Sequence, residues 1–417
     1  MIIAHDVINA QYCIDGRFTQ DDYFSSSEIV IQNNISYGLA DQWFAGIVQP
    51  DLNYFNIAYP DPAVDPLEKK PLIVLAHGGG FWGGEKEELD TMIQSLAQRG
   101  FIAVSTNYRK GWATDGTDDC SGDGESLAEA IYKSMQDINA CVRYLVANAD
   151  YYQIDTANIF LGGESAGAFS AMNSYYISQS EWNNIWPDDM YTYGQLNNST
   201  NDYNVTFTVK GFINMWGGLM DTNLIGSPEM KPTISFYGMT DDVVPPTEGY
   251  FLDCVNYTHL FGSVTVDHLM EENGICHALH ARPGTGHIAY PQLYTAGNAA
   301  CFFKSLFCDQ CTSYYANYQE AECSDLQLNT TSVYSNINDQ ARMYPNPAAD
   351  YVVIAVTGQL EYNSALRITN ATGANIQTPY VQNGNSFTVD LSGLPSGVYF
   401  VSVKNGSELK TGSFIKN

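Results

Sequence analysis

Basic residues are scarce in this sequence of 417 residues. Lysine and arginine together number 18, against 46 aspartates and glutamates, so the formal net charge at pH 7 is -28. A field of this sign repels the phosphate backbone of nucleic acids and anionic lipid surfaces. We therefore expect no nucleic-acid partner, and we interpret the acidity as a surface that favours solubility.

Long apolar runs are missing as well. No stretch of about 18 apolar residues occurs, so the sequence predicts no membrane-spanning helix. The first residues, MIIAHDVINAQ, lack the basic segment of a secretory signal peptide, and their apolar stretch is short. We interpret residues 1–30 as an N-terminal leader or the remnant of a signal.

Cysteine is absent from the C-terminal part of the chain. All nine cysteines lie between Cys13 and Cys323, which indicates two regions of different character. Their odd number leaves one thiol unpaired. Cys308 and Cys311 are the only close pair, and with no second pair or neighbouring histidine they are weak evidence for zinc. We expect disulfides formed in an oxidising compartment, with a connectivity that the sequence does not give.

From Pro71 onward the sequence alternates between short apolar runs and amphipathic stretches. Strands are predicted at 72–76 and 101–105 with a helix at 89–98 between them, and a long helix is predicted over 128–149. This alternation predicts an α/β fold built on a parallel sheet. Further elements are expected at 159–161, 168–177, 211–216, 233–237 and 276–281.

A polar stretch follows near 312–335. After it come short alternating segments such as 351–356 and 398–403, which predict a linker and an all-β module. The length of the chain also favours two domains over one.

Ser165 lies in a sequence that is typical of a catalytic serine. Gly163-Glu164-Ser165-Ala166-Gly167 fits the pattern G-x-S-x-G, and it follows a predicted strand and precedes a predicted helix. Small residues flank such a serine because the turn between strand and helix is too tight for larger ones. The pentapeptide alone is a weak signal, and its setting makes it a strong one.

A glycine cluster follows the predicted strand at 72–76. In His77-Gly78-Gly79-Gly80-Phe81 the glycines allow successive backbone N–H groups to point at one place, as an oxyanion hole requires. A flexible turn or a phosphate cradle is the alternative, but no Gly-Lys-Ser/Thr follows. We interpret the cluster as an oxyanion hole.

A serine nucleophile needs a base, and the base needs an orienting carboxylate. His287 is the histidine that lies in a glycine-containing loop after a late strand, whereas His259, His268, His277 and His280 lie in or near predicted elements. Asp241 follows the predicted strand at 233–237, and its neighbour Asp242 is the rival for the acid. The order Ser165, Asp241, His287 is the order of this triad in α/β-hydrolases.

Residues 71 to about 308 resemble the carboxylesterase and hormone-sensitive-lipase-like branch of the α/β-hydrolases. The resemblance rests on the segment from Leu72 through the glycine cluster, Asn107-Tyr108-Arg109, Ile154-Asp155 and the G-x-S-x-G segment. It implies a doubly wound, mostly parallel sheet and an oxyanion hole formed by the amides of Gly79, Gly80 and Ala166. Two departures from the pattern, 115–125 and 178–208, are expected to border the entrance.

Residues 336–417 resemble the type IX secretion C-terminal sorting domain of Bacteroidetes. Met343-Tyr344-Pro345-Asn346-Pro347, Leu391-Ser392-Gly393-Leu394-Pro395 and the basic ending carry the resemblance. It implies a small Ig-like β-sandwich read by the secretion machinery, and an exported or cell-surface protein. A carbohydrate-binding module with exposed aromatic residues is the alternative.

The sequence therefore predicts a catalytic domain at 31–312, a linker at 313–335 and a sorting domain at 336–417. The expected activity is serine carboxylic-ester hydrolysis by Ser165, His287 and Asp241, with no metal or organic cofactor. A serine peptidase on the same fold and a non-catalytic binding protein are the alternatives. Four residues near the catalytic loops are the candidates for contact with substrate: Phe81, Trp82, Glu164 and Trp216.

Overall fold

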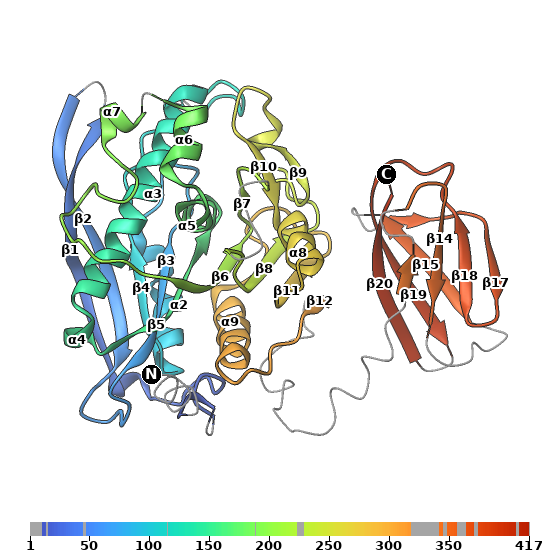
Figure 1. The fold of residues 1–417 in the computed structure, drawn as a ribbon, viewed down its shortest axis with the longest axis horizontal. Helices are drawn as coiled ribbons and strands as arrows, with labels where there is room; N and C mark the ends of the chain where they lie inside the picture. The colour runs from blue at the N-terminus through green and yellow to red at the C-terminus, as the bar shows by residue number, and fades with distance from the viewer. Residues whose placement is uncertain are drawn as a thin grey trace. The chain divides into compact units, whose positions relative to one another are not determined.

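The computed structural model describes residues 11–13, 16–44, 47–114, 116–187, 189–222, 229–317, 342–344, 348–356, 364–370, 374–405 and 408–416. The chain divides into two compact units, Met1–Asp325 and Leu326–Asn417 (Figure 1). Each unit has its own sheets and hydrophobic core, so each is described separately.

A nine-stranded sheet forms the centre of the first unit, in the order β1-β2-β4-β3-β5-β6-β8-β11-β12. Strand β2 is antiparallel to both of its neighbours, and every pair from β4 to β12 is parallel. This mostly parallel sheet confirms the predicted α/β-hydrolase fold. Its strands are β1 (Ile29–Phe44), β2 (Ile47–Pro60), β3 (Lys70–Ala76), β4 (Ile102–Thr106), β5 (Ile154–Glu164), β6 (Val209–Met215), β8 (Thr233–Gly238), β11 (His277–Arg282) and β12 (Tyr314–Asn317).

Helices cover both faces of this sheet. The long helices α3 (Gly124–Ala147) and α5 (Ala166–Tyr176) pack on one face, and α2 (Asp90–Gln98) and α9 (Gln292–Phe307) pack on the other (Figure 1). Successive residues of β3 alternate between the two cores: Leu72 and Val74 lie with α3 and α5, and Ile73 and Leu75 lie with α2 and α9. Burial on both faces explains why these strands read as continuous apolar runs.

The other elements of this unit are short. They are η1 (Ser26–Glu28), η2 (Lys86–Leu89), α4 (Ala149–Tyr152), α6 (Gln179–Ile185), α7 (Asp189–Tyr193), η3 (Phe251–Asp253), α8 (Ser263–Glu272) and a small sheet of β7 (Gly218–Leu219), β10 (His259–Gly262) and β9 (Glu248–Tyr250). Strand β12 lies inside the predicted linker but pairs with β11, so the first unit extends beyond its predicted end at residue 312.

The N-terminal segment belongs to this unit where it is described. Tyr12 and Phe18 are buried in the core formed with α2 and α9, and Cys13 forms a disulfide with Cys308. Arg17 makes an ion pair with Asp65 at 2.7 Å, and both side chains are buried. The interpretation of residues 1–30 as a leader is therefore wrong for the described residues from position 11 on, and residues 1–10 lie outside them.

The expectation of disulfides is confirmed. Three bridges join described residues, Cys13–Cys308, Cys120–Cys254 and Cys276–Cys311. Cys301 is also disulfide-bonded, and Cys141 is a buried free thiol. The adjacent Cys308 and Cys311 thus bond to different parts of the chain instead of sharing a zinc ion.

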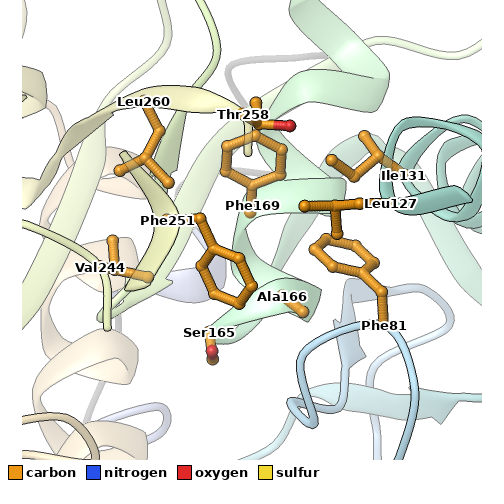
Figure 2. Close-up of a pocket in the computed structure, with 10 residues that line it drawn as sticks. All are labelled: Phe81, Leu127, Ile131, Ser165, Ala166, Phe169, Val244, Phe251, Thr258 and Leu260. Atoms are coloured by element: carbon orange, nitrogen blue, oxygen red, sulfur yellow. The ribbon is translucent and has the colours of Figure 1, made fainter. Parts of the chain in front are cut away.

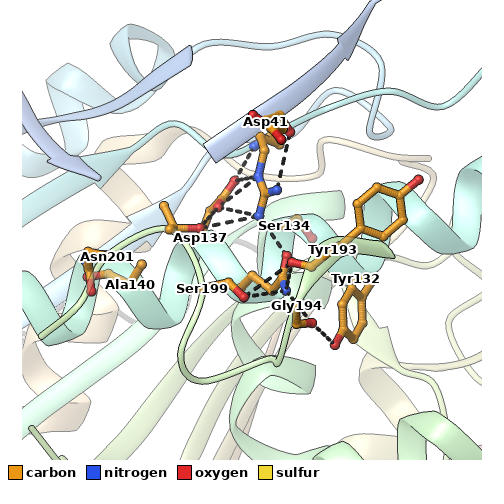
Figure 3. A network of polar contacts seen from close by, with 12 residues as sticks. Asp41, Tyr132, Ser134, Asp137, Ala140, Tyr193, Gly194, Ser199 and Asn201 are labelled. Atoms are coloured by element: carbon orange, nitrogen blue, oxygen red, sulfur yellow. Dashed lines mark hydrogen bonds and ion pairs between the residues drawn. The ribbon is translucent and has the colours of Figure 1, made fainter. Parts of the chain in front are cut away.

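The insertion at 178–208 is anchored to α3 by a polar network (Figure 3). The Gln136 amide donates to the backbone oxygens of Tyr193 and Gly194 at 2.9 and 3.0 Å, and the Tyr132 hydroxyl donates to Gly194 at 2.6 Å. Asn201 donates to the backbone oxygen of Ala140 at 2.8 Å. These bonds fix the insertion to the helix.

The second unit consists of two four-stranded antiparallel sheets, in the orders β13-β14-β18-β17 and β16-β15-β19-β20. A separate core that includes Val352, Phe387 and Val401 lies between them, which confirms the predicted β-sandwich. The strands are β13 (Arg342–Tyr344), β14 (Tyr351–Ala355), β15 (Ala365–Asn370), β16 (Asn375–Ile376), β17 (Tyr380–Asn383), β18 (Ser386–Asp390), β19 (Gly397–Asn405) and β20 (Glu408–Lys416). In the described parts of both units, no helix has the length and apolar character needed to cross a bilayer.

Candidate active site

Ser165 lies on the sharp turn between β5 and α5. Its backbone has φ +52° and ψ -119°, a conformation that is strained for a residue with a side chain. A Cβ added to Gly163 or to Gly167 would lie 2.2 Å from the backbone oxygen of Ala76. The two glycines of the motif are therefore required because β3 passes directly against the turn.

His287 lies between Ser165 and Asp241. Its Nε2 is 2.7 Å from the Ser165 Oγ, and its Nδ1 is 2.9 and 3.1 Å from the two carboxylate oxygens of Asp241. An ionised carboxylate can only accept, so Nδ1–H donates to it and Nε2 is left to accept the serine proton. The three side chains form a continuous hydrogen-bonded chain.

The carboxylate of Asp241 is itself held in place. It follows β8 and is 8% exposed, and its Oδ1 accepts hydrogen bonds from the backbone N–H groups of Val243 and Val244, both at 3.0 Å. The neighbouring Asp242 is exposed. Of the two carboxylates that the sequence left open, Asp241 is the one that contacts the imidazole.

The glycine cluster after β3 passes beside the serine. Gly79 and Gly80 have φ values of +106° and +60°, and a Cβ on Gly79 would lie 2.4 Å from the backbone oxygen of Gly83. Ala166 is the first residue of α5, where backbone N–H groups lack a partner within the helix. Among the described residues, the N–H groups of Gly79, Gly80 and Ala166 donate to no other backbone group.

His77 is the buried residue at the start of the glycine cluster. Its ring is fully buried and stacks on Tyr108 with centroids 4.4 Å apart. The Tyr108 hydroxyl donates to the backbone oxygen of His77 at 2.9 Å. Burial lowers the pKa of His77 to about 4, so this imidazole is neutral at physiological pH.

A small apolar pocket opens beside Ser165 (Figure 2). Its walls come from the glycine cluster, α5, α3 and the segment that follows Asp241. Thr258 is the one polar lining residue besides the serine. The lining residues are Phe81, Leu127, Ile131, Ser165, Ala166, Phe169, Val244, Phe251, Thr258 and Leu260. Such a surface favours a hydrocarbon group over a charged one.

The four predicted substrate contacts lie in different places relative to the pocket. Phe81 lines the pocket, but Trp216 is 1% exposed and packs in the core with α2 and α9, so its assignment to the pocket is wrong. Trp82 is 62% exposed and lies over Gly80 outside the lining, where contact with substrate stays a prediction. Glu164 also lies outside the lining. It accepts from Gln292 at 3.3 Å, and burial raises its pKa to about 7.

Most of the pocket was not predicted from the sequence. Phe169 could have been found from the sequence, because it lies one helical turn after Ser165 on α5 and therefore on the same side of the helix. Leu127, Phe251 and Leu260 come from distant segments and have no motif, so only the folded chain identifies them.

The other candidate histidines lie away from the serine. His280 is fully buried between the hydroxyls of Tyr294 and Tyr314, and burial lowers its pKa to about 3. His268 and His277 contact acidic residues near α8. In the described part of the chain, no three histidine, cysteine or acidic side chains gather where a metal ion could be held.

Comparison with known families divides the chain in the same way. Residues 61–241 match the BD-FAE family, and residues 342–417 match the secretion system C-terminal sorting domain. The second match identifies the C-terminal unit as an export address that directs the chain to the cell surface or beyond.

Curated relatives match over short stretches. Acetylcholinesterase 1 of Caenorhabditis briggsae is 30% identical over 134 residues, which are 31% of this chain and 20% of the relative. Neuroligin-like protein glit-1 of Caenorhabditis elegans is 37% identical over 71 residues, 17% of this chain and 10% of the relative. The chain thus matches a fifth or less of the length of these proteins.

Two esterases are among the similar solved structures. Esterase B of Lactobacillus rhamnosis has a TM-score of 0.44 at 15% identity, covering 74% of this chain and 92% of its own. The thermophilic esterase Est2 of Thermogutta terrifontis has a TM-score of 0.43 at 14% identity, covering 69% of this chain and 97% of its own.

Proposed function

Taking this chain as an α/β-hydrolase that carries a secretion sorting domain, we propose that it is an exported serine carboxylic-ester hydrolase. The observation that carries the proposal is the hydrogen-bonded chain from Asp241 through His287 to the Ser165 hydroxyl, with donor–acceptor distances of 2.9 and 2.7 Å.

The chemistry follows from the direction of these bonds. His287 Nε2 takes the proton of Ser165 as Oγ attacks the ester carbonyl, and the Asp241 carboxylate stabilises the imidazolium that forms. The imidazolium then gives its proton to the alkoxide oxygen, which leaves as the alcohol. Water, activated by the same imidazole, attacks the acyl-enzyme and releases the carboxylic acid. Serine and imidazole return to their starting states.

The negative oxygen of each tetrahedral intermediate is bound by backbone amides. We assign this role to the N–H groups of Gly79, Gly80 and Ala166, which have no backbone acceptor among the described residues. A single oxyanion donor contributes about 3 kcal/mol to the transition state in serine hydrolases. The stabilisation is large because the donors are already oriented before the charge develops.

The pocket beside Ser165 supports an ester with an apolar group as substrate. Among the described residues, its lining offers no carboxylate or cationic side chain to orient a charged substrate residue. The name of one relative, acetylcholinesterase, refers to an esterase activity and agrees with this choice. Hydrolysis of peptides by the same triad is the alternative that the experiment separates.

The test is a panel of p-nitrophenyl esters of increasing acyl length, assayed with the parent protein and with Ser165→Ala. We expect hydrolysis by the parent and a loss of roughly a millionfold in kcat in the variant. Feruloyl, acetyl-xylan and polyester substrates extend the panel toward natural esters. Equal rates for both proteins would refute the proposal, and activity on peptides alone would favour the peptidase.

A further inference from the structure

The pocket beside Ser165 lies on the acyl side of the bound ester. The alcohol oxygen must receive its proton from His287 Nε2, so the alcohol part of the substrate lies next to the imidazole. The lining of the pocket includes Ser165 and Ala166 but neither His287 nor Asp241. The group that fills this pocket is therefore the acyl chain, an assignment that rests on the proposed ester hydrolysis.

Phe251 lies in a part of the pocket wall that has little regular structure. It begins η3, three residues long, between the short strands β9 and β10. Its side chain is 7% exposed, and Figure 2 shows its ring in the middle of the lining with Ser165 and Ala166 beside it. Phe81 and Phe169, by contrast, are fixed by the glycine cluster and by α5.

The segment around Phe251 is instead fastened to the loop that precedes α3. The disulfide Cys120–Cys254 joins the two, and the Gly122 N–H donates to the Tyr257 hydroxyl at 2.7 Å. The Trp112 ring packs edge-on against Phe251 and Tyr257, at centroid distances of 5.6 and 5.2 Å. The Asn256 amide also donates to the backbone oxygens of Cys120 and Gly122 at 3.3 and 3.5 Å. The aromatic wall is thus held from behind by a covalent bond, hydrogen bonds and ring contacts.

We propose that Phe251, held in place by the Cys120–Cys254 disulfide, sets the length of the acyl group that the site accepts. The space that the lining encloses is small, about 20 Å³ for the centre of a water-sized sphere. A longer chain needs the Phe251 ring to move, and the bridge behind it resists that movement. Short acyl groups enter, and longer ones are excluded. Residues 116–125 thereby act on specificity without lining the pocket.

The experiment measures kcat/KM for p-nitrophenyl acetate, butyrate and octanoate with the parent, Phe251→Ala and the double variant Cys120→Ser/Cys254→Ser. We expect the parent to prefer acetate and butyrate to octanoate. Phe251→Ala should raise the octanoate-to-acetate ratio by roughly tenfold or more, since a methylene group in an apolar pocket changes selectivity by this order. The double variant should raise the ratio in the same direction.

The octanoate-to-acetate ratio of kcat/KM is the informative readout, because general destabilisation of the protein lowers the rates on both esters together. The matched control is Cys276→Ser/Cys311→Ser, which removes a bridge that connects the start of β11 to the segment before β12 and has no residue in the lining. We expect this control to leave the ratio unchanged. If Phe251→Ala does not fold, Leu260→Ala on β10 enlarges the same wall and should also raise the ratio.

Three results would overturn the inference alone: a parent that hydrolyses octanoate as well as acetate, an unchanged ratio in both wall variants, or an equal shift in the control. Failure of the proposed function is distinguishable, because Ser165→Ala would then match the parent on every ester. In that case the proposed function and the inference that rests on it would both be refuted.

Discussion

At the scale of single residues, two adjacent carboxylates after β8 have opposite surroundings. Asp241 is buried, binds two backbone N–H groups and contacts the imidazole of His287, whereas Asp242 is exposed. A carboxylate in the first setting orients the base and stabilises its charged form, and one in the second is solvated.

Replacing each carboxylate by its amide tests this difference. Asp241→Asn should lower kcat by about 10⁴, because an amide in this position favours the wrong imidazole tautomer. Asp242→Asn, the matched control one residue away, should keep the rate of the parent. The measurement is kcat on p-nitrophenyl acetate, with thermal melting to confirm that both variants fold. A larger loss of kcat in Asp242→Asn than in Asp241→Asn would show that Asp242 is the acid and that the assignment of Asp241 is wrong.

The residues that were predicted from the sequence are those with a local signal. Ser165 and its glycines are visible because the turn imposes small neighbours over five positions. Trp216 was misassigned because an aromatic residue after a strand end can point either to the site or to the core, and here it packs in the core. Phe251 and Leu260 carried no local signal, since they reach the pocket only through tertiary structure.

At the scale of elements, helix α8 places a carboxylate that is mostly shielded from solvent near β8 and β11. Asp267 has one oxygen without a hydrogen-bond partner among the described residues, and the Nε2 of His277 on β11 is 3.8 Å from it. Glu271 and His268 on the same helix and Tyr237 on β8 are its other titratable neighbours. Burial, with the charge of Glu271 as a smaller cause, raises the pKa of Asp267 to about 8.

This shift predicts how stability depends on pH. The pKa is raised on folding, so between about pH 4 and the folded value the native state holds one more proton than the unfolded state, and stability falls as pH rises. Asp267→Asn is neutral throughout. It should melt close to the parent at pH 4.5 and at a higher temperature than the parent at pH 8.5.

Differential scanning fluorimetry at the two pH values measures this effect. His277 is present in both proteins, and burial is the main cause that lowers its pKa. A variant that melts below the parent at pH 8.5, or a difference that does not change with pH, would contradict the burial of a neutral Asp267.

Helices and strands were predicted correctly where the hydrophobic period of a segment and its length both indicated the same type of element. The strands at 72–76, 233–237 and 276–281 and the helix at 128–149 correspond to β3, β8, β11 and α3 within a few residues. The hairpin of β1 and β2 went unpredicted, because its long strands carry many polar residues and no sharp turn signal. Strand β12 lies in a polar stretch and is recognised only by its pairing with β11.

At the scale of the whole molecule, the proposed catalytic site and the secretion sorting domain lie in separate units. The proposed catalytic side chains and the pocket lining lie between Phe81 and His287, inside the first unit, and the second unit has its own core. No residue of the C-terminal unit is needed for the proposed reaction.

Truncation after Asp325 tests whether ester hydrolysis needs the second unit. The shortened chain, purified from the cytoplasm of an expression host under oxidising refolding, should retain the kcat/KM of the full chain. In a host with a type IX secretion system, activity at the cell surface should require residues 326–417. Loss of kcat/KM in a folded truncated protein would show that the second unit contributes to the site.

The central claim is that Ser165 is the nucleophile, activated by His287, and covalent labelling tests it most directly. A fluorophosphonate probe should inactivate the parent in proportion to the adduct formed, and mass spectrometry of the peptides should place that adduct on Ser165. His287→Ala should react far more slowly. Complete inactivation with the adduct on another residue, or full ester hydrolysis by protein labelled at Ser165, would contradict the account.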